Sequence, residues 1–452
     1  MRRIGPGRIS GVIAAALAAL GVVFAMPPAA RASTLIENVS VLPMTGVGLQ
    51  ADWAVLVDGD RIVAAGPRAS LAAPADATVV DGAGGVLLPG LIDMHIHLDH
   101  GHDGRQSDVQ LGLLAAHGVT TARVMWGHNG QLALRRAIVA ENRFAPSLVL
   151  AGPGFSKSAL SPAEVKAEVE RQAKEGWDLI KVHWKPTLAQ YDAIISAAKS
   201  VGKEVDGHVP YAVSLDHVLA SGQRSIEHMD GYIRDIKAEG SAAPQAALQG
   251  AVARSKAAGV AVVPTLFGWR VHLHHTSSDE LNALPGLAFV PASTLANWRS
   301  RYERPLKEQT KDWIKLLIGR RDVDAIVANR NRLLKAFSDG GVPVLFGTDS
   351  GQPFVVAGTA VPTEMAEMRA AGLTNRQIIE SATVTAGRFL DSSGRLGVIA
   401  PGARADILVL PADPTTDLQA FARPLGVMLR GKWHSGEEIG RFLADARAAA
   451  GR

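Results

Sequence analysis

The sequence of 452 residues contains no cysteine. Disulfide bonds and thiolate ligands are therefore excluded, and any metal ion must be held by nitrogen and oxygen ligands. The chain also lacks a basic patch with interleaved aromatic residues, which argues against a nucleic-acid partner. Hydrophobic residues make up 47% of the composition, which is enough for a large barrel with an accessory domain.

Residues 1–32 have the plan of a bacterial-type secretory signal peptide. A basic start is followed by an apolar stretch over residues 11–26 and by Ala30-Arg31-Ala32, which fits a cleavage site. The apolar stretch is shorter than the roughly 20 residues that a membrane-spanning helix needs. The four arginines of this segment account for the whole formal charge of +4. We therefore expect an exported, periplasmic or secreted protein, neutral in charge and without a membrane anchor after cleavage.

Eight strand-like apolar runs alternate with helical patterns between residues 89 and 390. One helical pattern opens with Ser161-Pro162-Ala163-Glu164, a capping box with proline at the first helical position, and ends at Gly176. Repeated alternation of strand and helix predicts an α/β fold of the (β/α)8 barrel type. The predicted strands are 91–97, 119–126, 147–152, 178–184, 204–209, 225–229, 260–266 and 342–349.

The two flanks, residues 33–88 and 391–452, differ from the centre of the chain. They consist of short alternating stretches broken by glycine and proline, and neither has enough strands to form a core alone. We predict that they pair into one small β-sandwich beside the barrel. Residues 267–321 form an insertion after the seventh run that is rich in aromatic residues, and we interpret it as a lid or substrate wall.

Two histidines, His95 and His97, close the first predicted strand. Side chains two residues apart on a strand point the same way, so both imidazoles project from its end together. The sequence has two further pairs of this spacing, His100/His102 and His272/His274, in polar, loop-like stretches. We interpret those pairs as surface or lid residues.

Four other ionisable residues lie at or near the ends of later strands. Lys181, His208, His228 and Asp349 belong to the fourth, fifth, sixth and eighth runs. The C-terminal ends of barrel strands form the face on which active sites lie. Each residue alone could be a buried core residue, but the whole set predicts a binuclear metal site.

These positions resemble the signature motifs of the amidohydrolase superfamily. The matching segments are 89–97, 178–181, 207–210, 225–228 and 347–349, and residues 371–406 resemble the family's return to its flanking sandwich. The resemblance implies the binuclear branch that includes prolidase-like dipeptidases and ochratoxinase-like amidases. The Gly-Gly-His element that such dipeptidases carry after the third strand is missing here, so the resemblance does not imply a dipeptide substrate.

The resemblance also implies a ligand set and a mechanism. Two divalent ions, with zinc expected, would be bound by His95, His97, Lys181 as a carbamate, His208, His228 and Asp349. The metals would lower the pKa of a bridging water from about 15.7 toward 7. Asp349 would accept a proton as the bridging hydroxide attacks and return it to the leaving nitrogen.

The sequence thus predicts a metal-dependent hydrolase of an amide, peptide or cyclic amide bond in a small molecule. Two alternatives stay open: a mononuclear deaminase-type or lactone hydrolase of the same superfamily, and a non-catalytic periplasmic binding protein. A retaining glycosidase would need paired carboxylates and not this histidine set. Candidate substrate-binding residues are Trp126, His128, His183 and Tyr232. The oligomeric state is open, and a homo-oligomer is compatible with the sequence.

Overall fold

The computed structural model describes residues 33–98, 105–156, 159–237, 240–273, 276–302 and 323–451. The chain falls into two units, Met1–Arg31 and Ala32–Arg452, and all described residues belong to the second. The predicted signal peptide, the pair His100/His102 and His274 lie outside the described residues. No helix within the described ranges is both long enough and apolar enough to cross a membrane.

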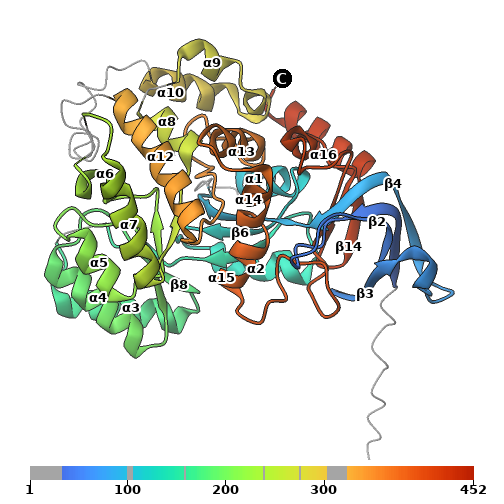
Figure 1. Ribbon diagram of the computed structural model, residues 1–452, viewed down its shortest axis with the longest axis horizontal. Helices are drawn as coiled ribbons and strands as arrows, with labels where there is room; N and C mark the ends of the chain where they lie inside the picture. Colours follow the sequence, from blue (N-terminus) through green and yellow to red (C-terminus); the bar gives the residue numbers. More distant parts are fainter. Residues whose placement is uncertain are drawn as a thin grey trace, which may run out of the picture. The chain divides into compact units, whose positions relative to one another are not determined.

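Both flanks of the chain contribute strands to one sheet of seven strands. They are β1 (Thr34–Val41), β2 (Gln50–Asp58), β3 (Arg61–Pro67), β4 (Thr78–Pro89), β12 (Ile407–Leu410), β13 (Gly426–Leu429) and β14 (Lys432–Ser435). Their order is β14-β13-β12-β4-β1-β2-β3. The flanks meet where β12 pairs antiparallel with β4 and Leu408 lies opposite Leu88. Figure 1 shows labelled strands of both flanks, β2, β3, β4 and β14, on one side of the ribbon. The predicted pairing of the two ends is therefore present, as one continuous sheet where a small sandwich was expected.

The C-terminal flank also contains a helix that its alternating pattern did not predict. This helix, α16 (Gly436–Ala449), begins after Ser435, and Ser435 and Glu438 form a capping box. It packs against α1 (Arg105–Ala116), where Gly112 leaves room for the ring of Phe442. The flank thus reaches back from the sheet to the central part of the chain.

Among its described residues, the central part contains seven parallel strands in two sheets. One sheet has the order β5-β6-β7, and the other has the order β11-β10-β9-β8. The strands are β5 (Leu91–Ile96), β6 (Val119–Val124), β7 (Ser147–Leu150), β8 (Leu179–Val182), β9 (Glu204–Gly207), β10 (Ser225–Glu227) and β11 (Ala261–Val263). A parallel bridge between Ala151 and Leu179 joins β7 to β8. Each of the seven lies within a predicted strand.

The eighth predicted strand corresponds to the extended segment 342–350. Leu345 N donates to Val262 O at 2.9 Å, and Met94 N donates to Phe346 O at 2.8 Å. Parallel bridges also pair Val344 with Val262 and Ser350 with Ile96. The segment therefore lies hydrogen-bonded between β11 and β5, which places Asp349 beside His95 and His97.

Helices follow the parallel strands, and their ends agree with the local sequence signals. In α3, Ser161 and Glu164 form the predicted capping box, Pro162 is the first residue, and Gly176 ends the helix with φ +93°. The helices of the central part are α1, α2 (Gln131–Ala140), α3 (Pro162–Glu175), α4 (Leu188–Ser200), α5 (Leu215–Ser221), α6 (Tyr232–Asp235), α7 (Gln245–Ala258), α12 (Val323–Gly340), α13 (Ala360–Ala370), α14 (Asn375–Ser381) and α15 (Val384–Leu390).

The described part of the insertion is helical. It comprises α8 (Leu266–His272), α9 (Ser278–Asn282), the 3-10 helix η2 (Pro285–Phe289) and α10 (Ala292–Tyr302). Two further 3-10 helices, η1 (Arg68–Ser70) and η4 (Leu418–Ala422), belong to the flanks. A large apolar core runs through the central part and continues into the flanking sheet.

Candidate metal centre

The six predicted ligands lie at or next to the C-terminal ends of five strand segments. His95, Lys181 and Asp349 are the next-to-last residues of β5, β8 and the segment 342–350, whereas His97, His208 and His228 directly follow β5, β9 and β10. Five of them line one cavity of about 170 Å³, and the sixth, His95, lies against Asp349 at its base. The described residues that line the cavity are His97, Trp126, Lys181, His183, Trp184, His208, His228, Trp269, His272, Asp349 and Gln352.

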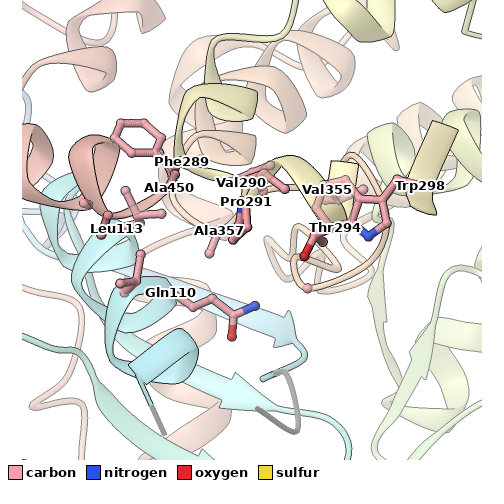
Figure 2. Close-up of a pocket in the computed structure, with 15 residues that line it drawn as sticks. Gln110, Leu113, Phe289, Val290, Pro291, Thr294, Trp298, Val355, Ala357 and Ala450 are labelled. Atoms are coloured by element: carbon pink, nitrogen blue, oxygen red, sulfur yellow. The ribbon is translucent and has the colours of Figure 1, made fainter. Parts of the chain in front are cut away.

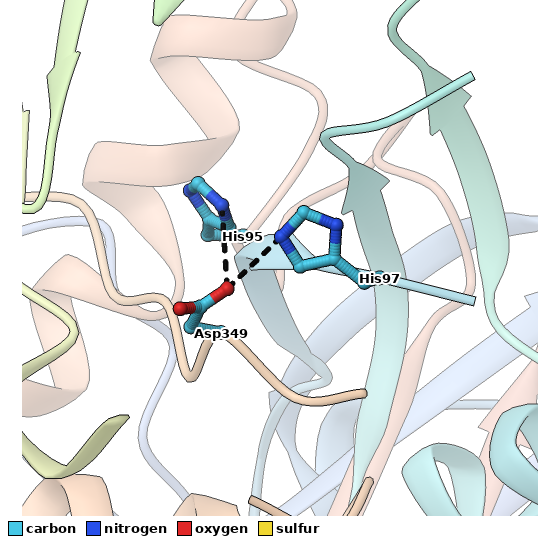
Figure 3. Close-up of side chains that lie close together, drawn as sticks. All are labelled: His95, His97 and Asp349. Atoms are coloured by element: carbon cyan, nitrogen blue, oxygen red, sulfur yellow. Dashed lines mark ion pairs between the residues drawn. The ribbon is translucent and has the colours of Figure 1, made fainter. Parts of the chain in front are cut away.

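Asp349 is in contact with both histidines of the first strand. Its Oδ1 atom lies 3.0 Å from Nε2 of His97 and 3.5 Å from Nε2 of His95 (Figure 3). Each of the three residues offers one ligand atom, and these three atoms lie within 4.8 Å of one another. Two imidazole nitrogens and one carboxylate oxygen at this separation form a group that could hold a metal ion.

The remaining predicted ligands surround the same point. The ring of His228 lies 4.6 Å from the ring of His95 and 4.9 Å from that of His208, measured between centroids. Lys181 is buried, and its Nζ atom has no hydrogen-bond partner among the described residues. A buried ammonium without a partner is costly, so the surroundings disfavour the charged form of Lys181.

Each of the three buried histidines among the predicted ligands makes a hydrogen bond through its Nδ1 atom. His95 Nδ1 lies 2.6 Å from Glu227 Oε2, and His208 Nδ1 lies 2.5 Å from Asp230 Oδ2. His228 Nδ1 lies 2.7 Å from the hydroxyl of Thr265. Such partners fix the ring orientation and leave Nε2 free for another ligand. His95 Nε2 indeed has no hydrogen-bond partner within the described ranges.

The side chain of Arg123 in β6 makes hydrogen bonds to residues of β5, β9 and β10. Its side chain is fully buried and donates to Asp206 Oδ2 at 2.7 Å and to Glu227 Oε1 at 2.8 Å. Its Nε donates to Met94 O at 2.7 Å. The positive charge of the guanidinium therefore balances the buried carboxylates of Asp206 and Glu227. Glu227 is also the residue that contacts Nδ1 of His95.

The electrostatics favour neutral histidines and an ionised aspartate. Burial, followed by nearby positive charges such as Lys181, lowers the pKa of His95, His208 and His228 well below the ordinary value. Burial would raise the pKa of Asp349, but the neighbouring histidines outweigh it and the pKa lies below the ordinary value. Burial also lowers the pKa of Lys181 to about 8. Neutral imidazole and carboxylate are the forms that bind metal ions.

The backbone is strained where it delivers these side chains. His228 has φ +59°, Asp349 has φ +58°, and Thr265 has φ +45°. Non-glycine residues in this region cost on the order of 1–3 kcal/mol each and are concentrated at functional sites. The strain at these positions therefore supports a functional reason for where the side chains point.

The insertion contributes to the cavity through α8. Trp269 and His272 line it, and His272 Nε2 lies 3.9 Å from Asp349 Oδ2. The carboxylate of Glu364 accepts hydrogen bonds of 2.8 Å from the backbone nitrogens of Leu266 and Phe267 at the start of α8. The beginning of the insertion is thus fixed as a wall of the cavity, in line with one of the two interpretations of the sequence.

Two of the four predicted substrate-binding residues line the cavity. Trp126 and His183 do, and the ring of His183 lies 4.5 Å from that of His208. Trp184 and Gln352 also line the cavity but were not identified from the sequence. Trp184 has a role that only the fold reveals, because its Nε1 donates to the same oxygen of Asp230 that His208 contacts.

The other two predicted substrate-binding residues lie elsewhere. Tyr232 is fully buried in the core, where its hydroxyl is 2.6 Å from Ser255 Oγ. Tyr232 follows His228 by four residues, but His228 and Met229 have positive φ and turn the chain away between them. His128 is near Trp126, with 6.3 Å between the ring centroids, and is not among the cavity-lining residues.

Comparisons with known proteins agree with this geometry. The model of the amidohydrolase family matches residues 86–434. An uncharacterized protein of Mycobacterium tuberculosis is 26% identical over 420 residues, which cover 86% of this chain and 95% of that protein. The structure of a bottromycin amidohydrolase is 25% identical with a TM-score of 0.71, covering 93% of this chain and 91% of that one. A putative prolidase from Bifidobacterium longum is 21% identical with a TM-score of 0.68, covering 92% and 99%.

Proposed function

Because this chain belongs to the amidohydrolase family and is a hydrolase acting on carbon–nitrogen bonds, we propose that it cleaves an amide, peptide or cyclic amide bond at a binuclear metal centre. The observation that carries the proposal is the convergence of the six side chains at one cavity. They come from the ends of five strand segments, and residues from 95 to 349 meet there.

The donor atoms fit two divalent metal ions, for which zinc is the expected element. His95 Nε2 and Lys181 Nζ are buried without hydrogen-bond partners among the described residues, and both belong to groups that bind metal when neutral or modified. The proposed ligands are His95, His97, Lys181, His208, His228 and Asp349. When bound, the ions would lower the pKa of water and polarise the carbonyl of the substrate.

Asp349 is the proposed proton carrier. It is held ionised by its histidine neighbours, so it can accept the proton that the attacking water loses. The carboxylic acid then returns this proton to the leaving nitrogen as the carbon–nitrogen bond breaks. His272, close to Oδ2 of Asp349, and His183 complete the wall around the reacting groups.

Lys181 is proposed to carry a carbamate. Its neutral amine would form a nitrogen–carbon bond to CO₂ and lose one proton, which converts the neutral amine into an anion with two oxygen donors. The absence of a hydrogen-bond partner for Nζ within the described ranges and the burial of the side chain both favour the loss of positive charge.

Two further parts of the proposal concern the whole chain. The bridges at Ala151–Leu179, Val262–Val344 and Ile96–Ser350 support a closed barrel of eight strands that carries the site at one end. The signal-like sequence of residues 1–32 supports export.

A hydrolysis screen tests the proposed activity. The zinc-loaded protein would be incubated with N-acyl amino acids, dipeptides and cyclic amides, and the released amine would be quantified. Asp349→Asn, purified in parallel, controls for contaminating hydrolases. Activity in the wild type that a chelator removes and zinc restores is expected, whereas activity that the chelator leaves unchanged would contradict the proposal.

A further inference from the structure

A second, larger cavity lies next to the metal centre. Its volume is about 310 Å³, and it is enclosed by α1, α16, the insertion elements η2 and α10, and the segment 351–357. Figure 2 shows Phe289 and Trp298 toward opposite ends of its labelled lining. The described residues that line it carry no charge, and apart from Gln110 and Thr294 their side chains are apolar.

One short segment separates the two cavities. Gln352 lines the metal cavity, whereas Gly351 and Val355 line the apolar one. Gly351 packs directly on the metal-centre strand, because a Cβ atom there would lie 2.2 Å from the carbonyl oxygen of His97 and 3.0 Å from its Cβ. The wall of the apolar cavity is therefore in contact with a proposed metal ligand.

The chemistry of the walls restricts what can bind there. A charged group would gain no charged partner from the described lining, so it is disfavoured. An apolar group gains from burial, and an engineered apolar cavity of about 150 Å³ is known to hold benzene. A cavity of about 310 Å³ has room for an aryl group with a short alkyl arm, or for an alkyl chain.

We propose that this cavity binds an apolar group of the substrate, an alkyl chain or an aryl group attached to the amide whose bond is cleaved. The proposal rests on the proposed function and narrows its substrates to amides with one bulky apolar substituent. The observation that relates the cavity to the substrate is the segment 351–355, which borders both the metal cavity and the apolar cavity.

Alkyl hydroxamates offer a test that does not depend on hydrolysis. Their head group chelates metal ions, and the tail can be lengthened from acetohydroxamate through butano- and hexano- to octanohydroxamate. Calorimetric titration of the zinc-loaded protein should show affinity rising by about fourfold for each added methylene until the cavity is full. Equal affinity across the series would overturn the proposal.

Two filling variants with matched controls locate the effect. Ala449→Trp and Thr294→Trp place an indole in the cavity from α16 and α10, whereas Ala448→Trp and Ala296→Trp add one at exposed positions of the same helices that are not among the lining. The filling variants should lose the dependence on chain length while still binding acetohydroxamate. The controls should keep it, and circular dichroism would verify that all four fold. Dependence that persists in both filling variants would overturn the proposal.

Failure of the metal centre can be recognised separately. If acetohydroxamate does not bind, the proposed metal centre is wrong, and n-octanol then serves as the probe in saturation-transfer NMR. An octanol signal that is lost in Ala449→Trp and kept in Ala448→Trp still supports the subsite, whereas equal signals overturn it. A change of oligomeric state in Ala449→Trp without loss of chain-length dependence would identify the cavity as a contact between copies and overturn the proposal.

Discussion

Glu227 Oε2 lies 2.6 Å from Nδ1 of His95, and both side chains are fully buried. The other oxygen of the same carboxylate accepts a hydrogen bond from Arg123. Glu227 therefore joins a proposed ligand to a charge network that lies outside the cavity. Its effect on metal binding can be measured apart from catalysis.

Glu227→Gln should weaken metal binding, because the amide cannot accept both hydrogen bonds as a carboxylate does. Loss of such a partner typically costs about 10–100-fold in metal affinity. Competition with a chromogenic chelator would measure the dissociation constants. Glu204→Gln, at an exposed position of β9, is the matched control and should leave them unchanged. Wild-type affinity in Glu227→Gln would show that His95 is oriented by packing alone.

Metal analysis of the purified protein should approach about two ions per chain, since the six donors can supply two sites. Lys181→Ala should lower this value and the activity, and bicarbonate added with zinc should speed reconstitution of the stripped wild type. Lys199→Ala, exposed on α4, provides the control. Full metal content in Lys181→Ala would show that Lys181 is not a metal ligand and has a structural role.

Asp349→Asn should separate metal binding from proton transfer. The amide keeps an oxygen donor but cannot accept the proton, so most metal should remain while kcat falls by about 10²–10⁴. Metal content and kcat would be measured on the same preparation. A near-normal kcat at full metal content would move the role of base to His183 or His272.

His434 should make the fold sensitive to acid. Burial, followed by Lys432, lowers its pKa to about 4, so the folded state holds this histidine neutral. Its contribution to stability is present above the unfolded pKa of about 6.5 and is lost as the pH falls toward 4. His434→Phe should therefore lose less stability than the wild type between pH 7 and pH 5 in urea unfolding. Equal losses in the wild type and in His434→Phe would refute the assignment.

Protein isolated from the native host should begin at Ser33. This follows from the proposed cleavage after Ala32. N-terminal sequencing of material from the exported fraction would check it, and an intact Met1 would reject the proposed export.

The sequence predicted the proposed ligands because each one closes an apolar run, and the ends of parallel strands meet at one edge. The spacing of His95 and His97 and the capping box at Ser161 are likewise signals that can be read from a few neighbouring residues. The partners of the ligands were not predictable. Glu227 and Asp230 flank His228 in sequence, yet they serve His95 and His208, and only the pairing of strands decides that.

Other failures have similar physical causes. Arg123 stands in an apolar strand, and nothing in the sequence shows that its charge is balanced by Asp206 and Glu227 from other strands. Tyr232 is close to His228 in sequence but lies in the core, because the positive φ of His228 and Met229 turns the chain away from the cavity. The position of His272 beside the cavity depends on where α8 begins. The carboxylate of Glu364, which lies in α13, holds the first two backbone nitrogens of α8 by hydrogen bonds.

The network around Arg123 has a consequence for metal supply. Its hydrogen bonds link β6 to β5, β9 and β10, the strands that carry four of the proposed ligands, and they are made entirely by the protein. The strand ends are thus held in register whether or not an ion is bound, so folding does not have to wait for metal. We expect the centre to be emptied and refilled in the folded chain. The ion found there would then reflect what the surroundings of the mature protein offer, and not what was present when the chain folded.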